Sequence, residues 1–221
     1  SRLAFDEIEY WARIDSAESF FLGERGCLMH EFNRGVTKYD IMPIPPVEAQ
    51  SVRFPVGPIE IWVEYRLLDE AIAAEHTVTE GYEGDAPAID DRGVSLHVFG
   101  ELHPGATPVE FLRFDCFEED AHYHYVSYEQ NTNEMVHLET AALGDPLVWA
   151  LDRIRTRLPQ MLARAGAEEL AGRVDLVALE AALPKIAEAA YHARFSHDDA
   201  AVHAGAMAGA APVGKAEGAT S

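Results

Sequence analysis

The chain has 221 residues, of which 48% are hydrophobic, and its 38 acidic against 17 basic residues give a formal net charge of −21. This length suits one sizeable domain with an extended arm, not two large domains. Such a negative field repels phosphate backbones, and no apolar run approaches the roughly 20 residues that cross a bilayer, so we expect no nucleic-acid or membrane partner.

The two cysteines, Cys27 and Cys116, lie far apart in the sequence. They give no disulfide framework, which is typical of a reducing compartment. The first residues show no positively charged segment followed by an apolar one, as a secretory signal would. We therefore expect the chain to be cytoplasmic.

Residues 1–58 are predicted to form an N-terminal arm. Apolar side chains in residues 5–14 recur at helical spacing, and a second short helix is expected to follow. Residues 41–58 contain five prolines, which favour an extended path that is poor in hydrogen bonds. The aromatic side chains of the arm have to be buried, either against the chain's own sheet or against another subunit.

Residues 59–198 are predicted to form an α+β core domain with a mainly antiparallel sheet over about residues 59–139. Apolar and polar side chains alternate in residues 59–67 and again in residues 94–99, as in strands with one buried face. A helix or irregular strand and a polar loop are expected between them. Residues 109–139 are rich in aromatic side chains and contain two turn-like segments, which predicts three successive strands in two hairpins.

The C-terminal part is predicted to be helical and to cover the apolar face of the sheet. Asp145 is expected to cap a long helix that begins at Pro146. Asp175 should cap another helix, and Pro184 should begin the last one. Residues 199–221 are rich in Ala and Gly and are predicted to be a flexible tail.

Potential metal-binding and acid/base groups gather on the predicted hairpins. His122 and His124 are two residues apart on one strand, so their imidazoles point to the same face, as two metal ligands from one strand must. Glu129 completes the pattern His-x-His-x4-Glu. This pattern resembles the first metal motif of the cupin superfamily, and the resemblance implies a double-stranded β-helix that binds one divalent metal ion. The flanking glycines of that motif are absent here.

The register of the first hairpin decides which side chains accompany these histidines. In one register Cys116 faces the first histidine, which indicates a buried structural cysteine. In the other register Asp115 faces the second histidine beside Arg113, a pair suited to acid/base work near neutral pH. His137 reaches the same face in one of two registers of the next hairpin.

The sequence favours two functions. The first is a non-catalytic accessory or small subunit of a cytoplasmic bacterial-type enzyme complex, without a cofactor, which acts through a protein partner or self-association. The aromatic-rich arm and the lack of a complete catalytic motif support it. The alternative is a small metal-dependent enzyme or small-molecule binder that holds one divalent transition metal. Its ligands would be His122, His124 and Glu129, with Asp115 or His137 as substitutes for the third.

Overall fold

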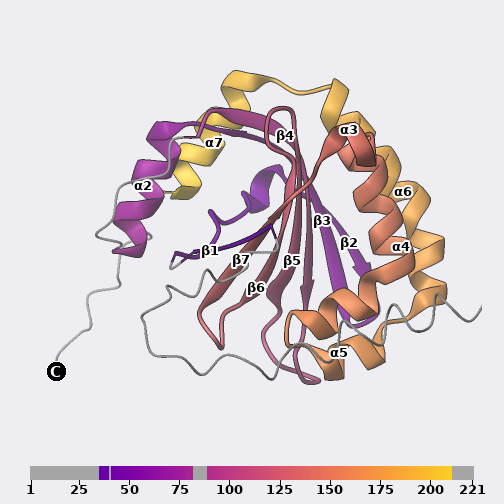
Figure 1. Cartoon of the computed structure of the whole chain (residues 1–221). Coiled ribbons are helices and arrows are strands. Elements are labelled where there is room, and N and C mark those ends of the chain that lie inside the picture. The colour runs from indigo at the N-terminus through magenta and orange to yellow at the C-terminus, as the bar shows by residue number, and fades with distance from the viewer. Residues whose placement is uncertain (1–34, 40, 82–88, 211–221) are drawn as a thin grey trace, which may run out of the picture. The chain divides into compact units, whose positions relative to one another are not determined.

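Seven strands form one antiparallel sheet in the computed structural model, which describes residues 35–39, 41–81 and 89–210 (Figure 1). The strands are β1 (Val36–Tyr39), β2 (Val52–Val56), β3 (Ile59–Leu68), β4 (Asp91–Gly100), β5 (Val109–Phe117), β6 (His122–Ser127) and β7 (Thr132–His137). They lie in the order β1-β7-β6-β5-β4-β3-β2 across the sheet. The predicted antiparallel sheet with C-terminal helices is therefore confirmed.

Helices lie on both sides of this sheet (Figure 1). They are α2 (Glu70–Glu80), α3 (Thr140–Leu143), α4 (Pro146–Arg164), α5 (Glu168–Arg173), α6 (Leu176–Phe195) and α7 (Asp199–Ala210), and Glu48–Gln50 forms the short 3₁₀ helix η1. The helices α4 and α6 cover one face, whereas α2 and α7 lie on the other side. Within the described part of the chain, none of the helices has the length and apolarity needed to cross a membrane.

The face toward α4 and α6 holds the main hydrophobic core. Alternate side chains of the central strands are fully buried there, among them Ile61, Leu96 and Phe114. They pack against Ile154 of α4 and Ile186 of α6. Each such side chain contributes about 1.5–3 kcal/mol by leaving water, so this face fixes the sheet onto its helices.

Two strands belong to the segment that the sequence assigns to an arm. β1 pairs with β7 and β2 pairs with β3, so the sheet extends into residues 1–58. In β2, Val52, Phe54 and Val56 alternate with Arg53 and Pro55, and Pro55 is tolerated because β2 is an edge strand. The predicted helices before residue 35, and Cys27, lie outside the described residues.

Helix α6 continues through Pro184, where the sequence predicts the start of a new helix. The buried residues Leu179, Ile186 and Ala190 lie on both sides of this proline and all belong to the main core. Proline inside a helix costs about 3 kcal/mol, and packing of a buried stripe can outweigh that cost. The predicted cap at Asp145 is confirmed, because its side chain accepts hydrogen bonds from the first turn of α4.

Residues 199–210 form α7, so the prediction of a flexible tail from residue 199 is wrong over this range. Asp198 accepts hydrogen bonds from two backbone N–H groups of the first turn, and alanine has the highest helix propensity. His203 Nε2 lies 2.7 Å from Asp69 Oδ2. Met207 packs against a small apolar cluster that consists of Leu68, Ile72 and Phe117. Residues 211–221 lie outside the described residues.

We expect the helix α7 to contribute to stability. Deleting residues 199–221 should expose the apolar cluster of Leu68, Ile72 and Phe117 and lower the melting temperature by roughly 5 °C. Differential scanning calorimetry measures this, with a chain that lacks only residues 211–221 as the matched control. Equal melting temperatures for the two truncated chains would show that α7 contributes nothing.

Candidate functional site

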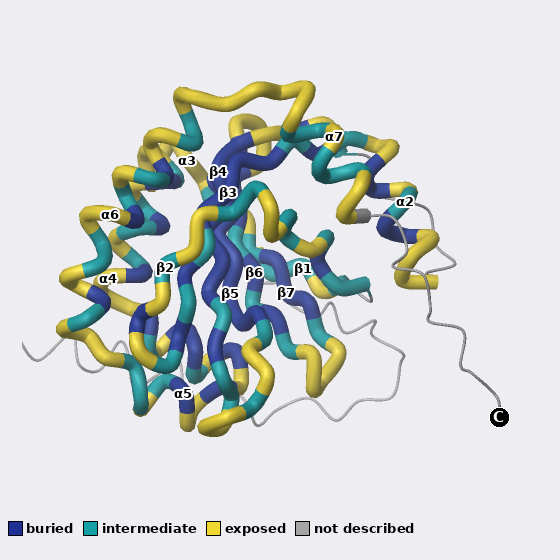
Figure 2. Tube along the Cα trace, turned by 180° about the vertical axis from the view of Figure 1, so that it is seen from behind, coloured by how far each residue is buried: buried dark blue, intermediate teal, exposed yellow. Residues whose placement is uncertain are grey.

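The sheet face opposite α4 and α6 carries charged side chains that are nevertheless buried. Figure 2 shows the central strands buried along most of their length. The buried polar side chains of this face, which we call the polar face, are Glu64, Arg66, Ser95, His97, Glu110, Arg113, Asp115, His122, His124 and Asn133. A buried charge is costly unless it is paired, so the arrangement of these pairs defines the site.

A β-bulge in β5 brings Glu110 to the polar face. Val98 pairs with Leu112 and Phe99 with Glu110, so the intervening Phe111 has no partner on β4. This extra residue lets Glu110 share a face with Arg113, although the two are three residues apart. Regular alternation would place Glu110 on the opposite face, which is why the sequence does not identify it as part of a site.

Glu110 then joins two cations. Arg113 donates from Nε to Oε1 at 2.9 Å and from Nη2 to Oε2 at 2.7 Å, and His97 Nδ1 donates to Oε1 at 2.6 Å. Burial raises the pKa of Glu110, but Arg113 and His97 outweigh it and hold the pKa well below its usual range. Burial lowers the pKa of His97, but Glu110 outweighs this and raises it. The polar face thus contains an ion network that is closed to solvent.

The β5–β6 hairpin pairs Asp115 with His122 and Arg113 with His124. Neither of the two registers considered from the sequence is right, because both assume a tighter turn. The carboxylate of Asp91 accepts hydrogen bonds from the backbone N–H groups of residues 118–120 and so holds a wider turn. The observed register still places Asp115 on the histidine face, as one of the two predicted registers does.

Asp115, His122 and His124 form one buried cluster. Asp115 Oδ2 lies 3.3 Å from His122 Nε2 and 3.4 Å from His124 Nε2, and one ligand atom from each residue lies within 4.8 Å of the others. Some other histidine–carboxylate pairs are closer, with 2.6 Å for His97–Glu110 and 2.7 Å between His137 and its partner Asp120, whereas His97–Glu64 at 3.4 Å is as wide as the cluster. Since charge-assisted N–H···O bonds measure about 2.7–2.9 Å, the cluster is wider than a direct hydrogen bond requires.

Both imidazoles are oriented through their other nitrogen. His122 Nδ1 donates to the backbone carbonyl of Asp120 at 2.6 Å, and His124 Nδ1 donates to Asn133 Oδ1 at 2.7 Å. The amide of Asn133 is fixed in turn, because its Nδ2 donates to the carbonyl of Ile41 at 3.0 Å. With the proton on Nδ1, a neutral imidazole presents a lone pair on Nε2 toward Asp115.

The electrostatics of the cluster favour a cation between these atoms. Burial raises the pKa of Asp115, but its neighbours His122, His124 and Arg113 lower it by more, so the pKa lies well below the usual range and the carboxylate is ionised. Burial lowers the pKa of His124 more than Asp115 raises it, so His124 is neutral near pH 7. Burial also lowers the pKa of His122, but Asp115 raises it by more. The His124 lone pair therefore faces a carboxylate without a proton between them.

The other predicted site residues lie elsewhere. Glu129 is exposed in the turn between β6 and β7, so the structure does not bring it to the two histidines. His137 pairs with His122 across the strands, but it is exposed and bonded to Asp120. Cys116 lies on the opposite face in the main core, where burial raises the pKa of its thiol.

The double-stranded β-helix that the cupin resemblance implies is not formed. The described strands make one open sheet, with β1 and β2 at its edges. A match of about eight residues reflects local strand geometry, whereas the fold follows from the apolar faces of α4 and α6 packing on the sheet.

A family model described as "Domain of unknown function (DUF7700)" matches residues 53–190. The chain belongs to this family. The matched segment includes the whole Asp115–His122–His124 cluster. Comparisons with curated proteins and with solved structures gave no match.

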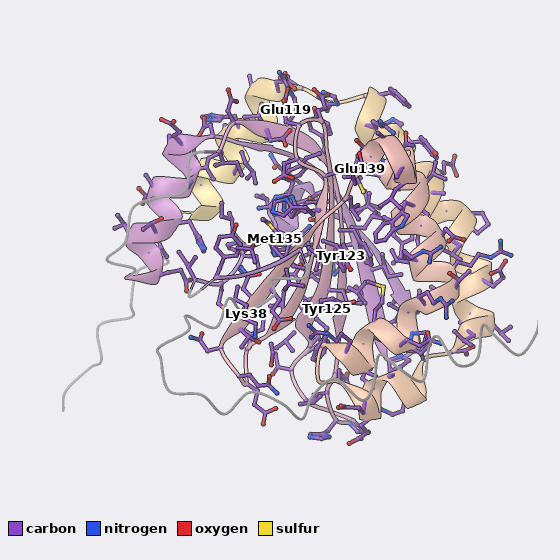
Figure 3. The ribbon with its side chains drawn as sticks, viewed as in Figure 1. Lys38, Glu119, Tyr123, Tyr125, Met135 and Glu139 are labelled. Carbon is purple, nitrogen blue, oxygen red and sulfur yellow. The ribbon has the colours of Figure 1, made fainter. Side chains whose placement is uncertain are left out.

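A cavity of about 360 Å³ adjoins the cluster, formed in part by the DUF7700 segment and in part by residues 39 and 41–44 before it. Asp115, His122 and His124 line one part of its wall, together with Arg66 and Arg113. Much of the remaining surface comes from apolar side chains, namely Ile41, Met42, Pro43, Ile44, Leu68, Ala73, Ile89, Phe117 and Met135. The wall also includes Tyr39, His76, Thr77, Asn133 and the acidic residues Asp90, Asp91, Glu119 and Asp120. Figure 3 shows Met135 on the side of the sheet toward α2, whereas Tyr123 packs on Trp149 of α4. An apolar cavity with a few convergent polar groups is typical of small-molecule sites.

Proposed function

We propose that this member of the DUF7700 family is a divalent-metal-dependent enzyme that acts on a small molecule. The metal ligands are His122 Nε2, His124 Nε2 and the Asp115 carboxylate. The observation that carries the proposal is their spacing, 3.3 and 3.4 Å from Asp115 Oδ2 to the two nitrogens. Ligand atoms about 2.0–2.1 Å from a tetrahedral zinc ion lie about 3.3–3.4 Å apart, whereas adjacent octahedral ligands at that distance lie about 2.9 Å apart.

The surroundings of the three ligands support the same assignment. Metal-bound histidines generally donate their other N–H to a carbonyl or carboxylate, as both do here to Asp120 and Asn133. Ser95 Oγ donates to the other oxygen of Asp115. Three protein ligands leave a fourth position for water or substrate, and zinc lowers the pKa of bound water to about 7. Because the cluster lines the cavity, that position would serve a hydrolytic reaction on a bound molecule.

Zinc titration of the purified, chelator-treated protein tests this proposal. We expect one equivalent to bind per chain, and Asp115→Asn to weaken binding by more than about tenfold because it removes the ligand charge. Glu129→Gln is the matched control and should bind zinc as the wild type does, since Glu129 is exposed in a turn. Failure of the wild type to bind zinc, or dependence on Glu129, would contradict the assignment.

The accessory-subunit function remains a second proposal, favoured by one observation. Val177 and Phe195 on α6 are 82% and 74% exposed, and the ring of Phe195 stacks on that of Tyr191. Tyr191 and Phe195 form one exposed aromatic pair, and contiguous exposed apolar surface is typical of protein-binding sites. They lie on the helix layer, so binding there is compatible with a site on the polar face.

A further inference from the structure

Arg66 has an unused donor in a buried position. Arg66 is only 5% exposed, yet its Nη1 has no hydrogen-bond partner among the residues that the structure describes. The rest of the guanidinium is held in place: Nε lies 3.0 Å from Glu64 Oε1, and Nη2 donates to the carbonyls of Ile44 and Pro45 at 2.9 and 3.3 Å. A buried charged donor without an acceptor is costly, which indicates that an acceptor is supplied from outside the chain.

Arg66 lines the same cavity as the proposed metal ligands. In the sheet, Arg66 pairs with Gly93, and Gly93 pairs with Phe117 on the strand that carries Asp115. Gly93 has no side chain, so none rises from β4 between Arg66 and Phe117. A ligand in the cavity can therefore contact Arg66 at one end and the metal at the other.

Charge balance on the polar face favours an anionic ligand. Together with the buried Asp91 of the cavity wall, its carboxylates number four, against two guanidinium groups and the protonated His97. With His122 and His124 neutral, as metal ligands are, these groups leave one negative charge. A divalent cation on the cluster turns this into one positive charge. In a buried site that excess is unfavourable, and a bound monoanion removes it. The groups counted are Glu64, Asp91, Glu110, Asp115, Arg66, His97 and Arg113.

The acidic residues of the cavity rim do not reverse this preference. Asp90 and Glu119 are exposed, so solvent and salt screen their charges. The carboxylate of Asp91 already accepts four backbone hydrogen bonds, and Asp120 is paired with His137. The free donor, Arg66 Nη1, is buried, and in the protein interior the effective dielectric constant is lower and charge interactions are stronger.

We propose that the cavity binds a small organic carboxylate whose anion accepts a hydrogen bond from Arg66 Nη1. Its apolar body lies against Leu68, Phe117 and Met135, and its reacting group faces the metal. The cavity volume of about 360 Å³ fits a small molecule of this kind. This inference rests on the proposed function, because the metal supplies the charge that the carboxylate balances.

Calorimetric titration with acetate, hexanoate and benzoate tests the inference, with hexanamide as the neutral analogue. Zinc-loaded wild type should bind hexanoate or benzoate more tightly than acetate, and hexanamide much less. Glu64→Gln/Arg66→Gln removes both members of an ion pair and should weaken carboxylate binding about ten- to a hundredfold. Arg92→Gln, which removes an exposed arginine, is the matched control and should leave carboxylate binding unchanged.

Zinc affinity of every variant is measured separately, so that the two proposals can fail independently. Loss of carboxylate binding with zinc binding intact supports the inference. Equal carboxylate binding by wild type and the double variant, or no carboxylate binding by the zinc-loaded wild type, overturns it. If the wild type binds no zinc, the proposed function fails, and titration of the metal-free protein then decides whether carboxylate binding depends on Arg66.

Discussion

Glu110→Gln should lower the free energy of unfolding by about 3–5 kcal/mol, since it removes one partner from a buried ion network. The substitution leaves the charges of Arg113 and His97 uncompensated, and the two residues are only 2% and 0% exposed. Urea denaturation at pH 7 measures the difference. Glu180→Gln is the matched control, because Glu180 also makes two hydrogen bonds to one arginine, Arg155, but in an exposed position, and its loss should change stability little.

The pH dependence of this difference follows from the direction of each pKa shift. The pKa of Glu110 is lowered on folding, so its contribution is present above the ordinary pKa of a glutamate and is lost as pH falls through the lowered value. The pKa of His97 is raised, so its contribution is present below about 6.5 and is lost as pH rises through the raised value. The difference in the free energy of unfolding between wild type and Glu110→Gln should therefore become smaller toward low pH and toward high pH. A difference that is constant from pH 4 to 9 would contradict the ion network.

A double substitution separates the network from simple packing. Glu110→Leu/Arg113→Met removes both charges and should be less destabilised than Glu110→Gln, because replacing a whole buried ion pair with apolar groups is often nearly neutral. If the double variant is as unstable as the sum of its single substitutions, the two residues do not act as a pair.

His122→Ala and His124→Ala should each weaken zinc binding by more than about a hundredfold, since even outer-shell partners of a metal are worth about 10–100-fold. The double variant should lose little more than either single one, because the first substitution already removes most of the binding energy. Competition with a chelator measures the affinities. The rise in melting temperature that zinc produces in the wild type should disappear in all three variants.

His137→Ala is the control for these substitutions. His137 pairs with His122 across the strands but is exposed and bonded to Asp120, so its loss should change zinc affinity less than about threefold. Additive, modest effects of the two cluster histidines would describe independent hydrogen-bonded groups. That result would favour the accessory-subunit proposal over the enzyme.

Local patterns in the sequence predict much of the sheet but only part of the site. Alternation in residues 59–67 and the turn composition after Phe117 are properties of neighbouring residues, and both are borne out by β3 and by the β5–β6 hairpin. The position of Asp115 opposite His122 depends on Asp91, which holds the turn from a distant strand. No local pattern carries that information.

The same distinction explains the remaining differences. Glu110 reaches the polar face because a β-bulge shifts the alternation of side chains by one residue. Arg66 is recognisable as a site residue only once the cavity is known. Helix α7 lacks a conspicuous apolar stripe in the sequence, and its contacts with Asp69 and Gln50 come from remote segments. Fold class follows from composition and periodicity, whereas a site depends on contacts between distant residues.

The segment before β2 holds the charged groups of the polar face mainly through its main chain. The carbonyl of Ile44 accepts from both Arg66 and Arg113, and the N–H of Val47 donates to Glu64 at 2.9 Å. Alanine scanning leaves peptide groups unchanged, so these anchors would go undetected in a side-chain survey of the protein. Replacing single amides with esters by chemical ligation addresses them directly, since an ester at Val47 deletes one donor and leaves every side chain in place.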